Sequence, residues 1–156
     1  VPNATIITRD SPSWVNVADD KNAGEADYSM HVTMDYESND SYRIRTVAIS
    51  GEVWHYLSSL ACDAYTTITL KNAQGNVIFQ QKSSYVWSGP DLASGSVDID
   101  FAVVPNVVVS GKTTVEGFVN WYCIDRSTIT DLSHPNNSIP NLPYVGNTFT
   151  NSFDIQ

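Results

Sequence analysis

A period-two alternation of apolar and polar residues is the feature that most restricts what this chain can fold into. From Asp27 to Tyr36, aromatic and aliphatic side chains alternate with Ser, His, Thr and Asp, and Ser96 to Val103 repeats the pattern. Successive side chains of an extended strand point to opposite faces, so both segments are expected to be amphipathic antiparallel strands. No long segment has a helical period, which predicts an all-β chain.

The segment from Thr113 to Ile124 is expected to be the central buried strand. Val115, Val119 and Trp121 fall on one face together with Cys123, and the other face carries the aromatic residues Phe118 and Tyr122. The other cysteine, Cys62, lies far upstream, and neither cysteine belongs to a CxxC motif. This usage favours a Cys62–Cys123 disulfide that would pin one sheet to the other, and the alternative is a pair of buried free thiols.

Turn-forming residues predict how the strands connect. Asn72 to Asn76 is expected to close a hairpin, because its Gly and Asn residues accept positive φ. Gly51 is expected to place a bulge or kink within an extended stretch from Tyr42 to Tyr56. Leu57 to Ala61 is expected to form a brief helical turn, and Asp125 to Gly146 a long irregular excursion.

Length and strand spacing define the expected fold. A chain of 156 residues is long enough for one domain with a substantial core and short for two. We therefore expect residues 1–156 to form a single domain, an antiparallel two-sheet β-sandwich of Ig-like or jelly-roll type with about eight or nine strands and one disulfide. The chain departs from a true immunoglobulin domain, since Trp54 precedes the first cysteine and Trp121 replaces the usual tyrosine before the second.

The charge balance and composition restrict partners and compartment. The chain has 8 Lys plus Arg against 17 Asp plus Glu, a formal net charge of −9. Phosphate backbones and anionic membranes attract basic proteins, so neither nucleic acid binding nor membrane insertion is expected. Low charge, abundant Ser, Thr and Asn, and a start without a basic leader indicate a processed, secreted or cell-surface protein. Asn3, Asn39 and Asn136 begin candidate glycosylation sequons.

Catalytic and metal-binding patterns are weak. His31, His55 and His134 lack ligand spacing and are expected on exposed strand faces or in loops. Asp98 and Asp100 are expected to share a strand face. Exposure of that face to solvent explains the two carboxylates without a role in acid–base catalysis. No serine lies in a GxSxG motif, so no catalytic residue and no enzyme activity are expected.

An acidic loop supplies the one candidate metal site. Asp19, Asp20, Asn22 and Asp27 cluster oxygen atoms of the kind that calcium prefers. The loop lacks the glycine placement of an EF-hand, and the alternative is a solvated acidic turn. No other cofactor is expected.

Two functional hypotheses follow. The apolar run Ala4, Thr5, Ile6 and Ile7 predicts a terminal strand within residues 1–9, paired in its own domain or donated to a neighbouring subunit. This favours a non-catalytic structural or adhesive protein, a homo-oligomer or the subunit of an extracellular filament, coat or matrix. The alternative is a carbohydrate-binding module or lectin, with or without calcium, whose aromatic side chains stack on sugar rings. The other interpretation of these aromatic residues is that they fill the core. The candidate ligand-binding aromatics are Trp54, Tyr85, Trp87 and Tyr122.

Overall fold

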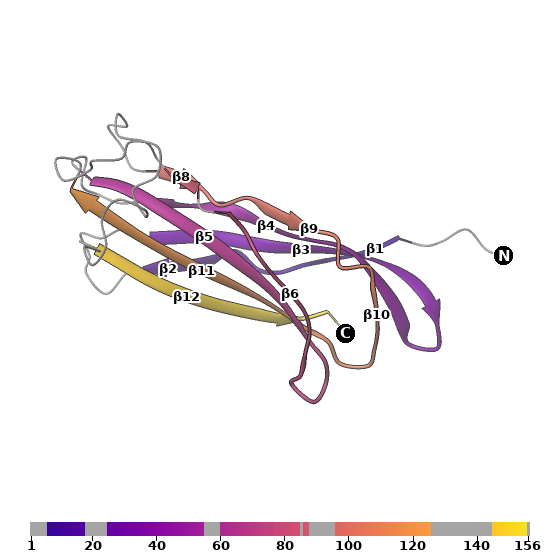
Figure 1. Ribbon diagram of the computed structural model, residues 1–156. Helices are drawn as coiled ribbons and strands as arrows, with labels where there is room; N and C mark the ends of the chain where they lie inside the picture. The colour runs from indigo at the N-terminus through magenta and orange to yellow at the C-terminus, as the bar shows by residue number, and fades with distance from the viewer. Residues whose placement is uncertain are drawn as a thin grey trace.

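The chain forms two antiparallel β-sheets. The computed structural model describes residues 6–17, 25–54, 60–84, 86–87, 96–125 and 145–155, without the side chains of 60–63, 86–87, 96, 122–125 and 145–147. Within these residues all regular structure is β-strand, so the expected all-β class is confirmed (Figure 1).

The larger sheet has seven strands that lie in four rows. β3 and β4 form its centre, β1 and β2 together line the free edge of β3, and β8, β9 and β10 line the free edge of β4. The strands are β1 (Ile6–Asp10), β2 (Trp14–Val17), β3 (Glu25–Ser38), β4 (Ser41–Trp54), β8 (Ser96–Asp98), β9 (Phe101–Val103) and β10 (Val107–Ser110).

The smaller sheet has five strands, also in four rows, in the order β12-β11-β5-β6, with β7 beside β5. β11 lies between β12 and β5 and pairs with both over nearly its whole length, so the expected central strand is confirmed. The strands are β5 (Leu60–Lys71), β6 (Val77–Lys82), β7 (Val86–Trp87), β11 (Thr114–Asp125) and β12 (Val145–Asp154).

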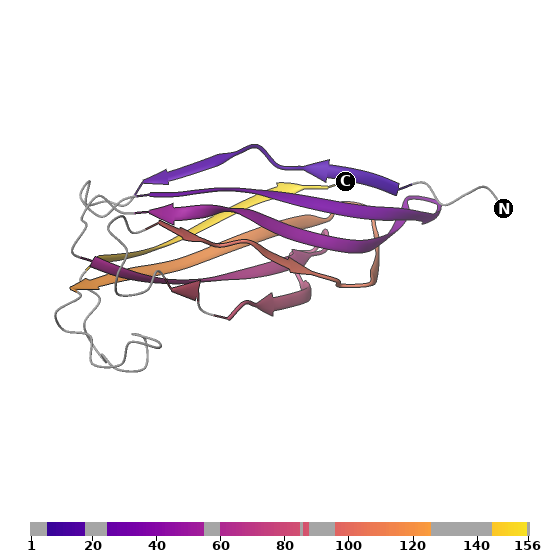
Figure 2. The same ribbon diagram turned by 90° about the horizontal axis from the view of Figure 1, so that it is seen from above.

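The two sheets lie face to face (Figure 2), and the side chains of their inward faces form one shared core. From Ala26 to Met34 every second residue of β3 is buried, and β11 buries Trp121 in the same way, as period-two alternation requires. Gly117 of β11 allows the two sheets to approach closely, because a Cβ atom there would lie 2.8 Å from Met30 Sδ of the opposite sheet. The core therefore depends on a small residue opposite a large one.

A polar bridge also joins the sheets within this core. The Tyr28 hydroxyl of β3 donates a hydrogen bond to the Gly117 carbonyl oxygen of β11 at 3.1 Å and accepts one from Asn151 Nδ2 of β12 at 2.6 Å. Asn151 Nδ2 also lies 3.2 Å from Asn16 Oδ1 of β2. A buried hydroxyl needs such partners, so the bridge satisfies the polar end of a core tyrosine.

The turn at Asn72 to Asn76 confirms the expected hairpin between β5 and β6. Gly75 has a φ of 81°, which glycine adopts without steric cost. Asn72 Oδ1 accepts hydrogen bonds from the backbone N–H groups of Gln74 and Asn76. The expected helical turn is wrong for Leu60 and Ala61, which begin β5, and the rest of that segment lies outside the described residues.

Gly51 does not interrupt β4 as expected, and the irregularity lies on the neighbouring row instead. β4 runs continuously from Ser41 to Trp54, and a Cβ atom at Gly51 would lie 2.1 Å from the Asp27 carbonyl oxygen. The strand expected from Ser96 to Val103 is divided into β8 and β9 opposite this point. There Asp100 Oδ1 accepts the Gly51 N–H at 3.0 Å, which replaces a missing ladder bond.

The two cysteines occupy opposed positions on adjacent strands. The register places Cys123 of β11 directly opposite Cys62 of β5. The expectation that a disulfide would pin one sheet to the other is therefore wrong, because both residues belong to the smaller sheet. The side chains of Cys62 and Cys123 are not among those that the structure describes.

The Tyr28 bridge predicts a pH-dependent stability. Burial raises the pKa of the Tyr28 phenol above its ordinary value of 10.0, and the hydrogen bonds from Asn151 oppose the rise only partly. The folded state holds this proton more tightly than the unfolded chain does. The contribution of the protonated Tyr28 to the free energy of unfolding is therefore complete below pH ~10 and is lost as the pH rises through the folded-state pKa.

Tyr28→Phe should lower the free energy of unfolding by about 1–3 kcal/mol at neutral pH, because it leaves buried hydrogen-bonding groups without a partner. The gap between wild type and variant should narrow above pH ~10, where only the wild type loses the Tyr28 contribution. Urea unfolding at neutral and alkaline pH measures both quantities. A gap that widens at alkaline pH would contradict the assignment.

Candidate functional site

β1 is the most weakly buried strand that pairs with the centre of the larger sheet. Its five residues pair with His31 to Asp35 of β3, and Ile6 is 61% exposed. Ile7 is the β1 residue that packs against the core. Backbone pairing therefore holds β1 in place more than burial does.

The residues after β1 are anchored firmly. The Ser11 N–H donates to the Met30 carbonyl oxygen at 2.9 Å, and the Met30 N–H donates to Ser11 Oγ at 2.8 Å. Beyond Pro12, the Trp14 ring lies edge-on to Tyr28 at 5.4 Å and to Phe153 at 6.2 Å. A boundary between a peripheral strand and an anchored one thus falls at Ser11.

An aspartate, a histidine and a serine form a hydrogen-bonded chain on the outer face of the larger sheet. Asp10 Oδ1 of β1 lies 2.8 Å from His31 Nδ1 of β3, and His31 Nε2 lies 3.1 Å from Ser29 Oγ. A carboxylate only accepts, so Nδ1 donates to Asp10 and a neutral ring leaves Nε2 to accept from Ser29. This is the connectivity of a proton relay that activates a serine nucleophile.

The surroundings of this relay are open to water. The His31 and Asp10 side chains are 43% and 59% exposed. Catalytic relays act in water-excluded sites with preorganised donors for the developing oxyanion. In this position the three residues chiefly connect β1 to β3, since Asp10 is the last residue of β1. The expectation that His31 lies on an exposed strand face is confirmed.

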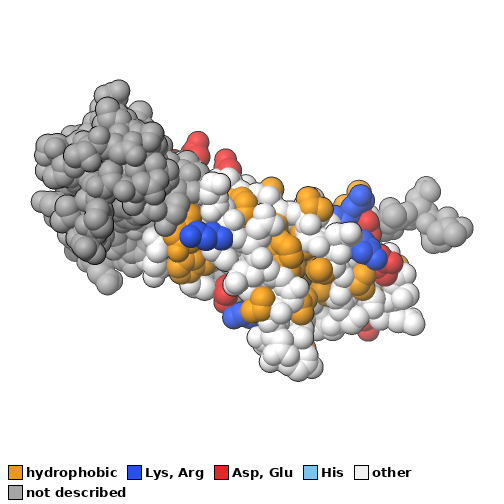
Figure 3. Space-filling view, viewed as in Figure 1, with side chains coloured by type: hydrophobic (Ala, Val, Ile, Leu, Met, Phe, Trp, Pro, Cys, Tyr) orange, Lys and Arg blue, Asp and Glu red, His pale blue; other side chains and the backbone are white. Residues whose placement is uncertain are grey.

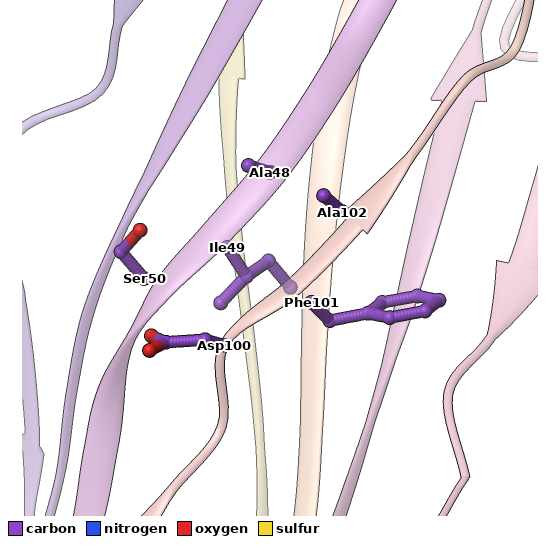
Figure 4. Close-up of a pocket in the computed structure, with 6 residues that line it drawn as sticks. All are labelled: Ala48, Ile49, Ser50, Asp100, Phe101 and Ala102. Carbon is purple, nitrogen blue, oxygen red and sulfur yellow. The ribbon is translucent and has the colours of Figure 1, made fainter.

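A shallow depression of about 350 Å³ lies on β4 and β9, close to the relay (Figure 4). Its wall residue Ser50 is the register partner of Ser29, and Ala48 is that of His31. The Asp100 side chain reaches from the segment before β9 toward β4, where it binds the Gly51 N–H. This hydrogen bond holds the segment before β9 against β4, and the expectation that Asp100 is not catalytic stays a prediction. The lining residues are Ala48, Ile49, Ser50, Asp100, Phe101 and Ala102.

The candidate calcium and glycosylation residues are only partly described. Asp19, Asp20 and Asn22 lie outside the described residues, and so do Asn3 and Asn136. Among the candidate calcium ligands, the structure describes Asp27, which belongs to β3. In the described part of the chain, no group of three or more His, Cys, Asp or Glu residues could hold a metal ion. Asn39 is exposed in the β3–β4 turn with a φ of 40°.

The candidate sugar-binding aromatics are dispersed. Trp54 ends β4 in the larger sheet, whereas Trp87 and Tyr122 belong to the smaller sheet and have side chains outside the description. Tyr85 is not described. The register aligns Trp87, Asp63 and Tyr122 in one row across β7, β5 and β11. The sugar-binding hypothesis therefore stays a prediction.

Sequence reasoning missed an aromatic contact on the outer face of the smaller sheet. The rings of Tyr65 and Phe118 lie 6.1 Å apart on β5 and β11, and Lys82 Nζ of β6 lies 4.0 Å from the centre of the Tyr65 ring. The alternation within each strand could have assigned these rings to the outer face. Their proximity depends on pairing between distant strands, which no local pattern encodes.

Neither the surface nor the comparisons with known proteins point to a particular reaction or ligand. On the face shown in Figure 3, hydrophobic side chains are scattered over a mostly uncharged surface. No helix among the described residues is long and apolar enough to cross a membrane. No protein-family model, curated protein sequence or solved structure matches the chain.

The open relay generates a test of catalytic competence. We expect a serine-reactive fluorophosphonate to label the wild type no more than Ser29→Ala, because an exposed Asp10–His31 pair stabilises an imidazolium weakly. Mass spectrometry of the labelled protein measures this. Labelling at Ser29 that His31→Gln abolishes would contradict the expectation and indicate a working nucleophile.

Proposed function

We propose that this chain is a secreted, non-catalytic structural or adhesive protein that assembles with copies of itself into an extracellular filament, coat or matrix. The observation that carries the proposal is the peripheral position of β1 at a sheet edge, where backbone pairing holds it. An identical strand from a neighbouring subunit would fit the same edge of β3, because an exchanged strand makes the contacts of the strand it replaces. Donation from each subunit to the next yields an open polymer.

The shallow burial of β1 supports exchange of this strand between subunits. Full burial of an isoleucine side chain is worth about 1.5–3 kcal/mol, and Ile7 is only partly buried. Release of β1 would therefore expose little apolar surface, while Ser11 and Trp14 stay bound to the rest of the sheet. The neighbour's strand would restore the ladder and the contact of Ile7 in full.

Exposed aliphatic side chains on both edges of the larger sheet also favour contact between subunits. Val15 of β2 is 63% exposed, and Val108 of β10 is 47% exposed. Exposed apolar side chains at a sheet edge can be covered when the edge pairs with another chain. The exposed turn residue Asn39 would accept a glycan without disturbing the core, as an exported protein allows.

We further propose that the fold is an Ig-like sandwich. Apart from the β1–β2 row, the larger sheet has the row order β3, β4 and β8–β10, and the smaller sheet has β12, β11, β5 and β6–β7. This order corresponds to strands A, B and E facing G, F, C and C′ of immunoglobulin-like domains. A jelly roll instead requires two Greek keys over its two sheets.

The proposed fold includes a Cys62–Cys123 disulfide within the smaller sheet. Directly opposed Cα atoms of antiparallel strands lie about 4.5 or 5.5 Å apart, and disulfides span Cα separations of about 4.4–6.8 Å. The register of these two residues therefore suits a bond between them. On the loop-entropy account such a bond stabilises a chain by roughly 2–4 kcal/mol.

Protein isolated without reductant, denatured and alkylated should contain no modified cysteine by intact mass. Cys62→Ala together with Cys123→Ala should lower the free energy of unfolding by roughly 2–4 kcal/mol in urea. Two alkylated thiols in the unreduced protein would contradict the disulfide and leave the two-sheet fold unaffected.

Deletion of Val1 to Thr8 should abolish open polymers and leave a folded protein, because the donated strand is lost while Trp14 still packs against the core. Light scattering and negative-stain imaging measure the assemblies, and circular dichroism measures the fold. Val77→Ser on β6, which changes an aliphatic side chain that is 53% exposed, is the matched control and should assemble normally. Assemblies of unchanged size after the deletion, or a wild type that stays monomeric, would contradict strand exchange.

A further inference from the structure

The four edge rows of the two sheets differ in how they resist pairing with another chain. The β1–β2 row is broken at Pro12, and the β8–β10 row is broken before Phe101 and again at Pro105. The β6–β7 row is broken after Lys82, the last residue of β6. Proline, lysine and bulges are the usual means by which proteins prevent edge-to-edge association.

β12 is the exception among the described strands. It lies at the end of its sheet and runs from Val145 to Asp154 without a proline, a lysine or a register shift against β11. At roughly 3.4 Å per residue, such a strand presents a continuous edge long enough for a second strand. An unprotected edge of this kind is a template for strand addition.

The inward face of β12 is incompletely covered. Phe149 and Phe153 pack against the core but are only partly buried, whereas their register partners on β11, Val119 and Val115, are fully buried. A strand placed beside β12 would cover the exposed edges of both phenylalanine rings. Covering apolar surface is the main driving force for association.

The residues of β12 are self-complementary in an antiparallel arrangement centred on Asn151. In this register Phe149 opposes Phe153 of the second copy on the inward face. Thr150 opposes Ser152 of the second copy on the outward face, where both residues are exposed. Aromatic pairs and hydroxyl pairs are favourable across antiparallel strands. A register shifted by one residue would place phenylalanines opposite exposed polar positions.

The charge of this edge also permits self-association. In a chain of net charge −9, the segment from Phe149 to Ser152 carries no charged residue. Two copies can therefore approach along this edge without placing like charges in direct opposition.

We propose that β12 is the contact surface for a second copy of this chain, through an isologous antiparallel β12–β12 pairing that joins the two smaller sheets into one. The inference deepens the proposed assembly by adding a contact that does not involve β1. A two-fold β12 contact and a β1 exchange together would link subunits at two independent places. Paired edges of this length bury less than the roughly 1,200–2,000 Å² of stable complexes, so the contact is weak on its own.

Sedimentation velocity of the full chain from about 10 µM to 1 mM tests the contact over the range expected of a weak interface. Thr150→Lys with Ser152→Lys places like charges opposite one another twice, about 5 Å apart at Cβ, and should abolish the β12 contact. Thr150→Glu with Ser152→Glu should do the same. An equimolar mixture of the two double variants should restore association, because each introduced cation then opposes an introduced anion.

Val77→Lys with Gln81→Lys on β6 is the matched control, since it adds the same charge at exposed residues of another edge and should associate as the wild type does. The proposal is overturned if the lysine double variant associates like the wild type, or if the mixture fails to restore association. Failure of β1 exchange alone would leave β12 dimers that respond to these charges. Failure of the β12 contact alone would leave assemblies that respond only to the deletion of Val1 to Thr8.

Discussion

The close approach of the two sheets around Gly117 is the constraint on which the rest of the structure depends. Met30 fills the space that the missing Cβ atom leaves, and the Tyr28 hydroxyl binds the Gly117 carbonyl oxygen. Packing and hydrogen bonding therefore meet at one residue of the central strand. Because Asn151 and Asn16 extend the same network, it also fixes β12 and β2 against one another.

The same alternation that fills the core leaves mostly polar side chains on the outer face of the larger sheet. On the larger sheet these include the chain of Asp10, His31 and Ser29, together with the depression beside Ser50. Their geometry permits proton transfer, but their exposure removes the low-dielectric surroundings that make such relays effective. The hydrogen bond between Asp10 and His31 connects β1 to β3.

The edges of the sheets are where the proposed function is concentrated. β1 contributes little burial and is followed by a firmly bound Ser11, which separates an exchangeable segment from an anchored one. β12 is continuous and carries no charged residue from Phe149 to Ser152, while the strands at the other edges are interrupted. Assembly through edges needs no reactive group, because main-chain donors and acceptors supply the bonds and side chains select the register.

The sequence by itself determined the strands and the turn at Gly75, because period-two alternation and tolerance of positive φ are local properties. It therefore predicted an all-β chain with an amphipathic strand where β3 lies and a central strand where β11 lies. Only the tertiary structure decided that Cys62 and Cys123 belong to one sheet, that Asp10 reaches His31, and that Tyr65 meets Phe118. These contacts join residues far apart in the chain, and their register follows from packing the whole core at once, which no single segment encodes.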